Sequence, residues 1–378
     1  MHYRKFGKTD FKVSALGFGC MRLPLLDKDD PASIDEEEAI RMIRYAIDNG
    51  VNYIDTAYPY HKEQSEIVTG KALQGGYREK VKLATKLPIW KVEEAADLDK
   101  YLNEQLEKLA TDHIDFYLIH ALNQNTWEKA QEVDIFSFLD RALEDGRIKY
   151  AGFSFHDNLD LFKEITDAYD WTFCQIQYNY MDEDYQAGTE GLHYAAAKGM
   201  AVVVMEPLRG GSLAQNIPAD IQQIWDKADT KRTSAAWALR WVWNSPEVSV
   251  VLSGMSTMEQ VVENVETADR AEPNTFSKDE LALINEVKEM YREKMKVACT
   301  GCGYCMPCPQ GVLIKYIFSH YNEAHMYGEL EDARKVYSRM MEDEKDGSVC
   351  IDCGQCVEAC PQNLPIPELL QEIHADLA

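Results

Sequence analysis

Eight short apolar runs, each followed by a longer amphipathic segment, occupy residues 14 to about 268 of this 378-residue chain. Each run is short and apolar enough to form a strand that is buried on both faces, as in parallel sheets. The intervening segments have helical spacing, for example 35–49 and 98–109. Eight strand–helix units in about 250 residues favour a closed parallel barrel over an open sheet. The expected strands are 14–21, 52–57, 81–86, 115–120, 150–155, 173–178, 201–206 and 248–254.

The first expected strand also argues against an open dinucleotide-binding sheet. Such sheets carry Gly-x-Gly-x-x-Gly after their first strand, whereas this chain continues "LGFGCMRLP" and runs into Pro24. Ahead of that strand, residues 3–14 have the pattern of a β-hairpin with its turn at 7–10, which we expect to close the lower end of the barrel. We therefore predict an α/β fold, a (β/α)8 TIM barrel preceded by a hairpin.

The charge of the chain limits what it can bind. Asp and Glu total 64 against 39 Lys and Arg, which gives a formal net charge of -25. Without a basic stripe, such a surface repels nucleic acid and anionic membranes, so we expect neither as a partner. No apolar run approaches the ~18 residues of a membrane span, and the charged N-terminus lacks the apolar part of a secretory signal. We expect a cytoplasmic protein.

Four polar side chains close neighbouring strands of the predicted barrel. Asp55 and Tyr60 follow the second strand, Lys86 ends the third and His120 ends the fourth. Singly, each has an ordinary structural explanation, as a turn cap, a loop aromatic, a surface lysine or a core histidine. Together they point to chemistry, because the ends of adjacent barrel strands meet at one rim. A cation held by a carboxylate lowers the pKa of a neighbouring phenol, which makes an acid for a carbonyl oxygen near neutral pH.

The stretches around these positions resemble the aldo-keto reductase family over residues 1–270. The resemblance implies that the chain transfers a hydride between NAD(P)H and a carbonyl substrate, an aldehyde or ketone. It implies that Tyr60 is the proton donor, that Lys86 and Asp55 tune it, and that His120 orients the carbonyl. The stretches, in the family's order and spacing, are "GVNYIDTAYPY", "SEIVTGKAL", "LATK", "DFYLIH", "GFS", "QIQYN" and "EPLRGG".

The same resemblance implies a nicotinamide cofactor across the mouth of the barrel, with Ser154 and Gln175 holding its carboxamide. Arg209 is a candidate for the pyrophosphate, or else a solvated arginine in a loop. The cofactor contacts that we expect are Gly19, Cys20, Met21, Ser154, Gln175, Met205, Pro207, Leu208, Arg209, Gly210, Gly254, Met255, Gln260, Glu263 and Asn264.

The chain departs from the family pattern around the cofactor. Phe155 follows Ser154 where the family usually has asparagine, and Met205 replaces the aromatic that commonly stacks on the nicotinamide. A thioether can still cover a ring face. Gly254 and Gln260 stand where NADPH-dependent relatives place a lysine and an arginine around the 2'-phosphate. We therefore predict that NADH binds at least comparably to NADPH.

Eight of the ten cysteines gather near the C-terminus in two runs, each ending in Cys-Pro. In a reducing compartment such thiols are typical of metal ligands rather than disulfides. The second run has the C-x2-C-x2-C-x3-C-P spacing of bacterial ferredoxins, which indicates a [4Fe-4S] cluster. Two zinc sites of four thiolates each, or disulfides, are the alternatives. The eight are Cys299, Cys302, Cys305, Cys308, Cys350, Cys353, Cys356 and Cys360.

Resemblance to two-cluster ferredoxins implies two [4Fe-4S] clusters whose fourth ligands are exchanged between the runs. The first run departs from the ferredoxin spacing, since it has two residues rather than three before Cys308. One cluster would take Cys299, Cys302, Cys305 and Cys360, and the other Cys350, Cys353, Cys356 and Cys308.

Helical patterns surround the cysteine runs. Ser277 is a suitable N-cap for a helix of about 20 residues at 277–296, and 315–327 and 331–344 have helical spacing between the runs. We predict a barrel domain at 1–275, followed by a linker helix and a small α-helical ferredoxin-like iron–sulfur domain at 276–378.

Two classes of function are compatible with these features. In the first, the chain is an oxidoreductase that acts on a small-molecule carbonyl, and its clusters carry electrons, with a redox partner protein as a further candidate, or only order the tail. In the second, it is a non-catalytic redox-sensing or accessory subunit, because a fold alone does not decide function. The presence of all four polar residues favours the enzyme, since a binding module needs no tuned tyrosine.

Overall fold

The computed structural model describes residues 1–28, 30–299, 303, 305–360 and 362–378. The chain divides into two compact units, Met1–Gly211 with Ala235–Phe276 and Ser212–Ser234 with Ser277–Ala378. The expected barrel domain includes 212–234, whereas this segment groups with the second unit. Its helix α8 (Ala219–Trp225) packs against α11 (Lys278–Glu293), and Lys294 Nζ lies 2.6 Å from Asp220 Oδ2.

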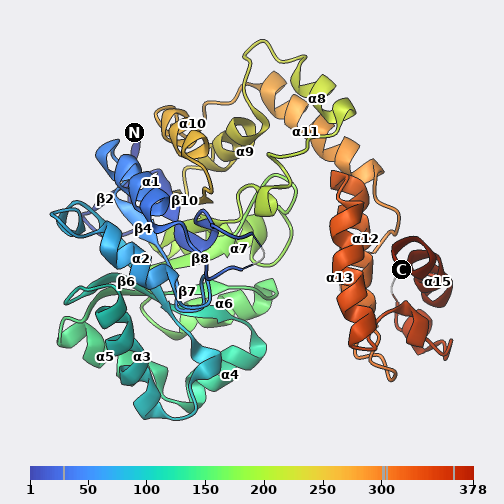
Figure 1. The fold of residues 1–378 in the computed structure, drawn as a ribbon, viewed down its shortest axis with the longest axis horizontal. Helices are drawn as coiled ribbons and strands as arrows, with labels where there is room; N and C mark the ends of the chain where they lie inside the picture. Colours follow the sequence, from blue (N-terminus) through green and yellow to red (C-terminus); the bar gives the residue numbers. More distant parts are fainter. Residues whose placement is uncertain (29, 300–302, 304, 361) are drawn as a thin grey trace. The chain divides into compact units, whose positions relative to one another are not determined.

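A closed barrel of eight parallel strands forms the first unit, as the alternation of apolar runs predicts (Figure 1). Neighbouring strands follow the order of the chain, and the last strand pairs with the first, with Gly254 opposite Gly19. All eight carboxyl ends therefore lie at one rim. The strands are β3 (Leu16–Gly19), β4 (Tyr53–Asp55), β5 (Lys82–Leu87), β6 (Ile114–Leu122), β7 (Ile148–Phe155), β8 (Phe173–Gln177), β9 (Ala201–Met205) and β10 (Val248–Gly254).

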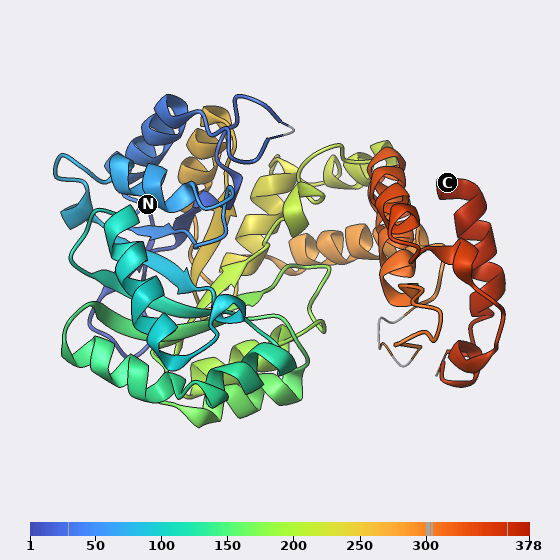
Figure 2. The same cartoon turned by 60° about the horizontal axis from the view of Figure 1, so that its bottom comes forward.

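Amphipathic helices surround the barrel, as Figure 2 shows from a second side. In α1 (Glu36–Asp48), for example, Met42, Ile43 and Ala46 are buried at the spacing of one helical face, and the Asp35 side chain caps the helix. Burial of such stripes holds the ring of helices on the strands. The others are α2 (Ser65–Ala72), α3 (Ala95–Lys108), α4 (Gln124–Glu132), α5 (Ile135–Glu144), α6 (Leu159–Ala168), α7 (Gly188–Ala197), α9 (Ser234–Trp243) and α10 (Met258–Ala268).

The predicted hairpin is confirmed as β1 (Tyr3–Lys5) paired with β2 (Lys12–Ser14). Phe6, in its turn, is fully buried, and its ring centroid lies 4.4 Å from that of Phe116 and 5.6 Å from that of Phe173. Both partners lie near the starts of their strands. The hairpin therefore closes the amino end of the barrel and leaves the carboxyl rim for chemistry.

Every regular element in the described part of the second unit is a helix. Ser277 caps α11 through a capping box with Glu280, as predicted. The patterns between the cysteine runs are confirmed as α12 (Ile314–Tyr327) and α13 (Leu330–Glu342), which pack with α15 (Ile366–Leu377) around a small apolar core. A short helix, α14 (Gln355–Glu358), lies within the second run. Among all described residues, each helix is too short or too polar to cross a membrane.

Candidate active site and cysteine cavities

Three of the predicted residues meet directly at the carboxyl rim. Asp55 ends β4, Tyr60 lies in the following loop, and Lys86 lies in β5, which pairs with β4. Lys86 Nζ lies 2.7 Å from Asp55 Oδ1, 3.3 Å from Tyr60 Oη and 2.8 Å from the Thr56 carbonyl oxygen. An ammonium group has three donors, so each one has a partner, and the lysine is fully buried. The group is rigidly positioned before any ligand binds.

Burial and charge set the protonation of this group. Burial favours a lower pKa for Lys86, but Asp55 and Tyr60 outweigh it and raise the pKa, so the side chain stays an ammonium. Burial raises the pKa of Tyr60, and the Lys86 charge opposes the rise without cancelling it. The expected lowering of the Tyr60 pKa is therefore wrong for this structure, because loss of hydration costs the phenolate more than the cation returns. Tyr60 is protonated at neutral pH.

His120 completes the predicted set, with its ring centroid 6.0 Å from that of Tyr60 and the two planes at 79°. Burial, reinforced by the charge of Lys86, holds the pKa of His120 well below its usual range, so the imidazole is neutral. Its Nδ1 has no hydrogen-bond partner in the part of the chain that the structure describes. A neutral imidazole carries one N–H donor, which suits a carbonyl oxygen as acceptor.

A local irregularity in β6 places His120 at the rim. The register between β6 and β7 shifts between Ile119 and Leu122, and Ala121 has a φ of 53°. The left-handed region costs a non-glycine residue on the order of 1 kcal/mol. The Ala121 N–H donates to Ser154 Oγ at 2.7 Å, which holds the distorted end of the strand in place. Such bulges are typical next to active sites, where they re-aim a side chain.

Ser154 and Gln175 lie opposite each other on β7 and β8, and both are almost fully buried. Gln175 Nε2 contacts Met205 Sδ at 3.4 Å, while its Oε1 has no partner among the described residues. Ser154 Oγ accepts the Ala121 N–H and still has its own hydroxyl hydrogen to donate. A buried acceptor beside a hydroxyl donor fits a carboxamide, which offers the complementary N–H and C=O groups.

The other expected cofactor contacts differ in their burial and in their place in the fold. Cys20 and Met255 are fully buried in the hydrophobic core, and Asn264 Nδ2 donates to Ser253 Oγ at 3.0 Å. Met205 is half-buried at the end of β9. The remaining positions lie in or beside the segments that follow β3, β9 and β10: Gly19, Met21, Pro207, Leu208, Gly210, Gly254, Gln260 and Glu263.

Arg209, the candidate for the pyrophosphate, has an acidic partner. Its Nε lies 3.2 Å from Asp182 Oδ2. The same carboxylate oxygen accepts from Gln177 Nε2 at 3.0 Å and from Asn179 Nδ2 at 2.9 Å. Arg209 is thus a half-buried member of a polar network after β8, and its binding of the pyrophosphate stays a prediction.

Sequence reasoning missed Trp90. This side chain is 46% exposed, and its ring centroid lies 5.0 Å from that of His120. It follows the end of β5 in the η3 turn (Ile89–Lys91). An exposed aromatic so soon after the strand that carries Lys86 was the available signal, because segments that follow barrel strands line the rim. Trp90 gives the rim an apolar wall next to the imidazole.

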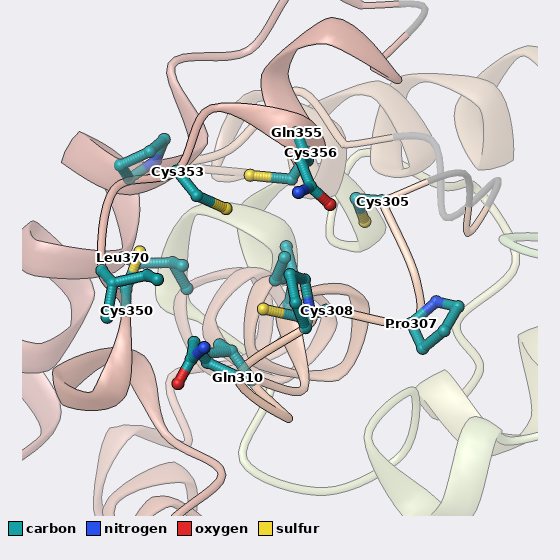
Figure 3. A pocket seen from close by; sticks show the side chains of 14 residues that line it. Cys305, Pro307, Cys308, Gln310, Cys350, Cys353, Gln355, Cys356 and Leu370 are labelled. Carbon is teal, nitrogen blue, oxygen red and sulfur yellow. The ribbon is translucent and has the colours of Figure 1, made fainter.

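Two cavities in the second unit are lined by cysteines. The first is lined by Cys308 together with Cys350, Cys353 and Cys356, whose side chains surround a common space in Figure 3, with Cys305 at its edge. The second is lined by Cys299, Cys305 and Cys360. Cys308 thus lies with the second run and Cys360 with the first, while Cys302 lies outside the described residues.

The described cysteines are all free thiols, so the disulfide alternative has no support among them. Within the described part of the chain, no three His, Cys, Asp or Glu side chains are close enough to hold a single metal ion. Binding of iron–sulfur clusters by these thiols therefore stays a proposal.

Comparison with known proteins places this geometry in a family. The model of the aldo/keto reductase family matches residues 15–289, and that of a 4Fe-4S dicluster domain matches 298–364. A probable aldo-keto reductase 1 of Glycine max is 25% identical over 69% of this chain and 82% of its own length. An uncharacterized oxidoreductase of Bacillus subtilis (strain 168) is 27% identical over 76% of this chain and 96% of its own.

A solved structure gives the same result. The holo form of an aldo-keto reductase from Bacillus halodurans superposes with a TM-score of 0.63 at 27% identity, and the match covers 76% of this chain and 96% of that one. The observed barrel and the family model agree. The chain belongs to the aldo/keto reductase family, and its C-terminal part matches a 4Fe-4S dicluster domain.

Proposed function

We propose that the barrel reduces an aldehyde or ketone to an alcohol with NADH or NADPH. The observation that carries this proposal is the environment of Lys86, whose three donors go to Asp55, Tyr60 and the Thr56 carbonyl in a fully buried position. An ion pair costs several kcal/mol of desolvation per ion when it is buried. Its position beside a protonated phenol at the carboxyl rim supports a catalytic use.

A bound reduced nicotinamide supplies the hydride that adds to the carbonyl carbon. The neutral His120 donates its N–H to the carbonyl oxygen and fixes its direction. Tyr60 Oη gives its proton to the same oxygen as negative charge develops there, and the product is the alcohol. The Lys86 ammonium stabilises the phenolate left on Tyr60, and Asp55 keeps that ammonium in place. Water returns the proton to Tyr60.

Gln175 Oε1, a buried acceptor that has no partner among the described residues, and the Ser154 hydroxyl would hold the cofactor's carboxamide. Met205, in contact with Gln175, would cover one face of the nicotinamide ring with its thioether. Trp90, beside His120, would provide an apolar wall for the substrate. These contacts favour a carbonyl substrate that carries an apolar or aromatic group.

We further propose that the second unit holds two [4Fe-4S] clusters. The ferredoxin spacing and the two cysteine-lined cavities support this. One set is Cys299, Cys302, Cys305 and Cys360, and the other is Cys308, Cys350, Cys353 and Cys356. Such clusters supply one-electron transfer, whereas a hydride carries two electrons, so their direct coupling to reduction would need a flavin or a radical step. Cys353, which is exposed, is the natural point of access for a redox partner protein.

The test uses full-length protein purified without oxygen. Oxidation of NADH and of NADPH is followed with a panel of aliphatic and aromatic aldehydes and ketones, and iron and acid-labile sulfide are measured on the same sample. We expect turnover with at least one carbonyl, and about eight iron and eight sulfide per chain. Binding of the nicotinamide without turnover on any carbonyl would instead identify a non-catalytic sensor or accessory subunit. Zinc without sulfide would overturn the cluster proposal alone.

A further inference from the structure

Glu66 carries a fully buried carboxyl group that the proposed mechanism does not use. It lies in α2, and its Oε1 accepts from Thr85 Oγ1 at 2.6 Å and from Gln105 Nε2 at 2.7 Å. Burial raises the pKa of Glu66, and these two hydrogen bonds oppose the rise. Three elements, α2, β5 and α3, therefore meet at one carboxyl oxygen beside the strand that carries Lys86.

Gln105 links this carboxyl group to Lys86. Its side chain is fully buried, and its Nε2 also lies 3.0 Å from the Lys86 carbonyl oxygen. Its Oε1 accepts from Tyr117 Oη at 2.8 Å. An amide has two N–H donors, and here one serves the Glu66 carboxyl group while the other serves the Lys86 main chain. The glutamine is thus a bridge between a helix and the strand of the lysine.

The Lys86 carbonyl takes a donor from outside the sheet because the neighbouring strand stops short of it. Carbonyl groups two residues apart in a strand point toward the same neighbouring strand. The Ala84 carbonyl accepts the Thr56 N–H at 2.9 Å, and β4 ends at Asp55. At Lys86, two residues farther on, the Gln105 amide occupies the place of a strand N–H. This amide therefore fixes the main chain where the lysine side chain begins.

The position of this main chain matters because the contact between Lys86 and Tyr60 is a long one. Nζ lies 3.3 Å from Tyr60 Oη, against 2.7 Å from Asp55 Oδ1. Adjacent residues of a strand face opposite sides, so Thr85 reaches the Glu66 carboxyl group on the helix side of β5 while Lys86 points into the barrel. A small displacement of the strand would carry the ammonium out of hydrogen-bond range of the phenol.

We propose that Gln105 and Glu66 are positioning residues for Lys86, an inference that rests on the proposed function. Gln105 holds the Lys86 main chain, and Glu66 holds Gln105, so that the ammonium stays within reach of the Tyr60 phenol. Both act through Lys86, since their contacts lie on the helix side of β5. The buried carboxyl group then has a role that packing of the core would not require.

The test uses the full chain and four variants, Gln105→Leu, Glu66→Leu, Glu66→Gln and Tyr117→Phe. Single-turnover reduction of a carbonyl from the panel is measured at saturating NADH, and Kd for NADH is measured by fluorescence. We expect Gln105→Leu and Glu66→Leu to slow reduction by about 10- to 100-fold, because a misplaced catalytic group costs rate, and to leave Kd unchanged. Glu66→Gln should keep most of the rate, since its amide oxygen can still accept both hydrogen bonds.

Tyr117→Phe is the matched control. It removes a buried hydrogen bond of the same cluster but leaves both donors of Gln105 in place. We expect it to lower the unfolding temperature and to leave the rate almost unchanged. An equal loss of rate in Tyr117→Phe and Gln105→Leu would mean that the cluster only supports the core, and it would overturn the assignment. An unchanged rate in Gln105→Leu would overturn it as well.

A second measurement does not need turnover. The ultraviolet change on alkaline titration, compared between each protein and its Tyr60→Phe counterpart, reports the ionisation of Tyr60. Burial raises the pKa of Tyr60 and the Lys86 charge opposes the rise, so the phenol should ionise at a higher pH in Gln105→Leu than in the wild type. An unchanged titration would contradict the positioning role. If the wild type reduced no carbonyl, the proposed function would fail, while this titration would still decide whether Gln105 positions Lys86.

Discussion

The rim of the barrel and the cysteine cavities are organised by different forces. At the rim, Lys86 is fully buried and each of its donors has a protein partner, so the arrangement exists without a ligand. In the second unit the described thiols are half-buried or, for Cys353, exposed, around a small apolar core. Thiols gathered around a cavity are ordered mainly by what they bind. The comparison suggests a reductase that is preorganised by packing and an iron–sulfur unit whose folding is coupled to cluster assembly.

The largest effect should come from Tyr60→Phe, which removes the proton donor and nothing else from the rim. We expect kcat for carbonyl reduction to fall by about 10²- to 10⁴-fold, because general acid catalysis is lost, while Kd for NADH and the iron content stay unchanged. The matched control is Tyr58→Phe, since the Tyr58 hydroxyl donates to Glu104 instead of contacting Lys86. Equal losses in the two variants would contradict the assignment of Tyr60.

Lys86→Met tests whether packing alone organises the rim. It leaves Asp55 buried without its cation, which should lower the free energy of unfolding of the barrel by about 3–5 kcal/mol. Urea unfolding followed by tryptophan fluorescence measures this loss. The control is Lys71→Met, whose partner Glu36 is half-exposed, and which should cost at most about 1 kcal/mol. Equal losses of unfolding free energy in the two variants would contradict the claim that the buried Lys86–Asp55 pair helps to organise the rim.

Cys353→Ser tests whether cluster binding organises the second unit. Loss of one thiolate should release one cluster, so iron and sulfide should each fall by about half. We expect new proteolytic cleavage beyond α11, where the second unit loosens, while the thermal transition of the barrel stays in place. Full iron content, or loss of the barrel transition together with the cluster, would show that the two regions are not organised separately.

The smallest effect should be the change in the rate of carbonyl reduction with pH. Burial raises the pKa of Tyr60, and the acid acts only in its protonated form, so the rate of reduction should stay level through neutral pH and fall only under alkaline conditions. Single-turnover reduction at a fixed, saturating NADH concentration gives this profile. A decline that begins near neutral pH would mean that the Lys86 charge outweighs burial during turnover.

Much of the site followed from position along the chain. Asp55, Lys86 and His120 were found because each ends or lies next to a short apolar run, and the ends of parallel strands in a barrel share one rim. The same rule applied to the third run would have found Trp90. The rule does not say which side chains pair at the rim, and the contact of Arg209 with Asp182, which follows a neighbouring strand, appeared only in the structure.

Sequence alone determined the features that depend on local spacing. The eight apolar runs with helical segments between them specified a barrel. The numbers of residues between the cysteines indicated iron ligands in two runs. Both signals depend only on residues that are close in the chain. Only the tertiary structure decided the rest. It reversed the expected pKa shift of Tyr60, buried Met255 in the core and brought Trp90 beside His120. Burial and partners far apart in the chain arise only when the barrel closes.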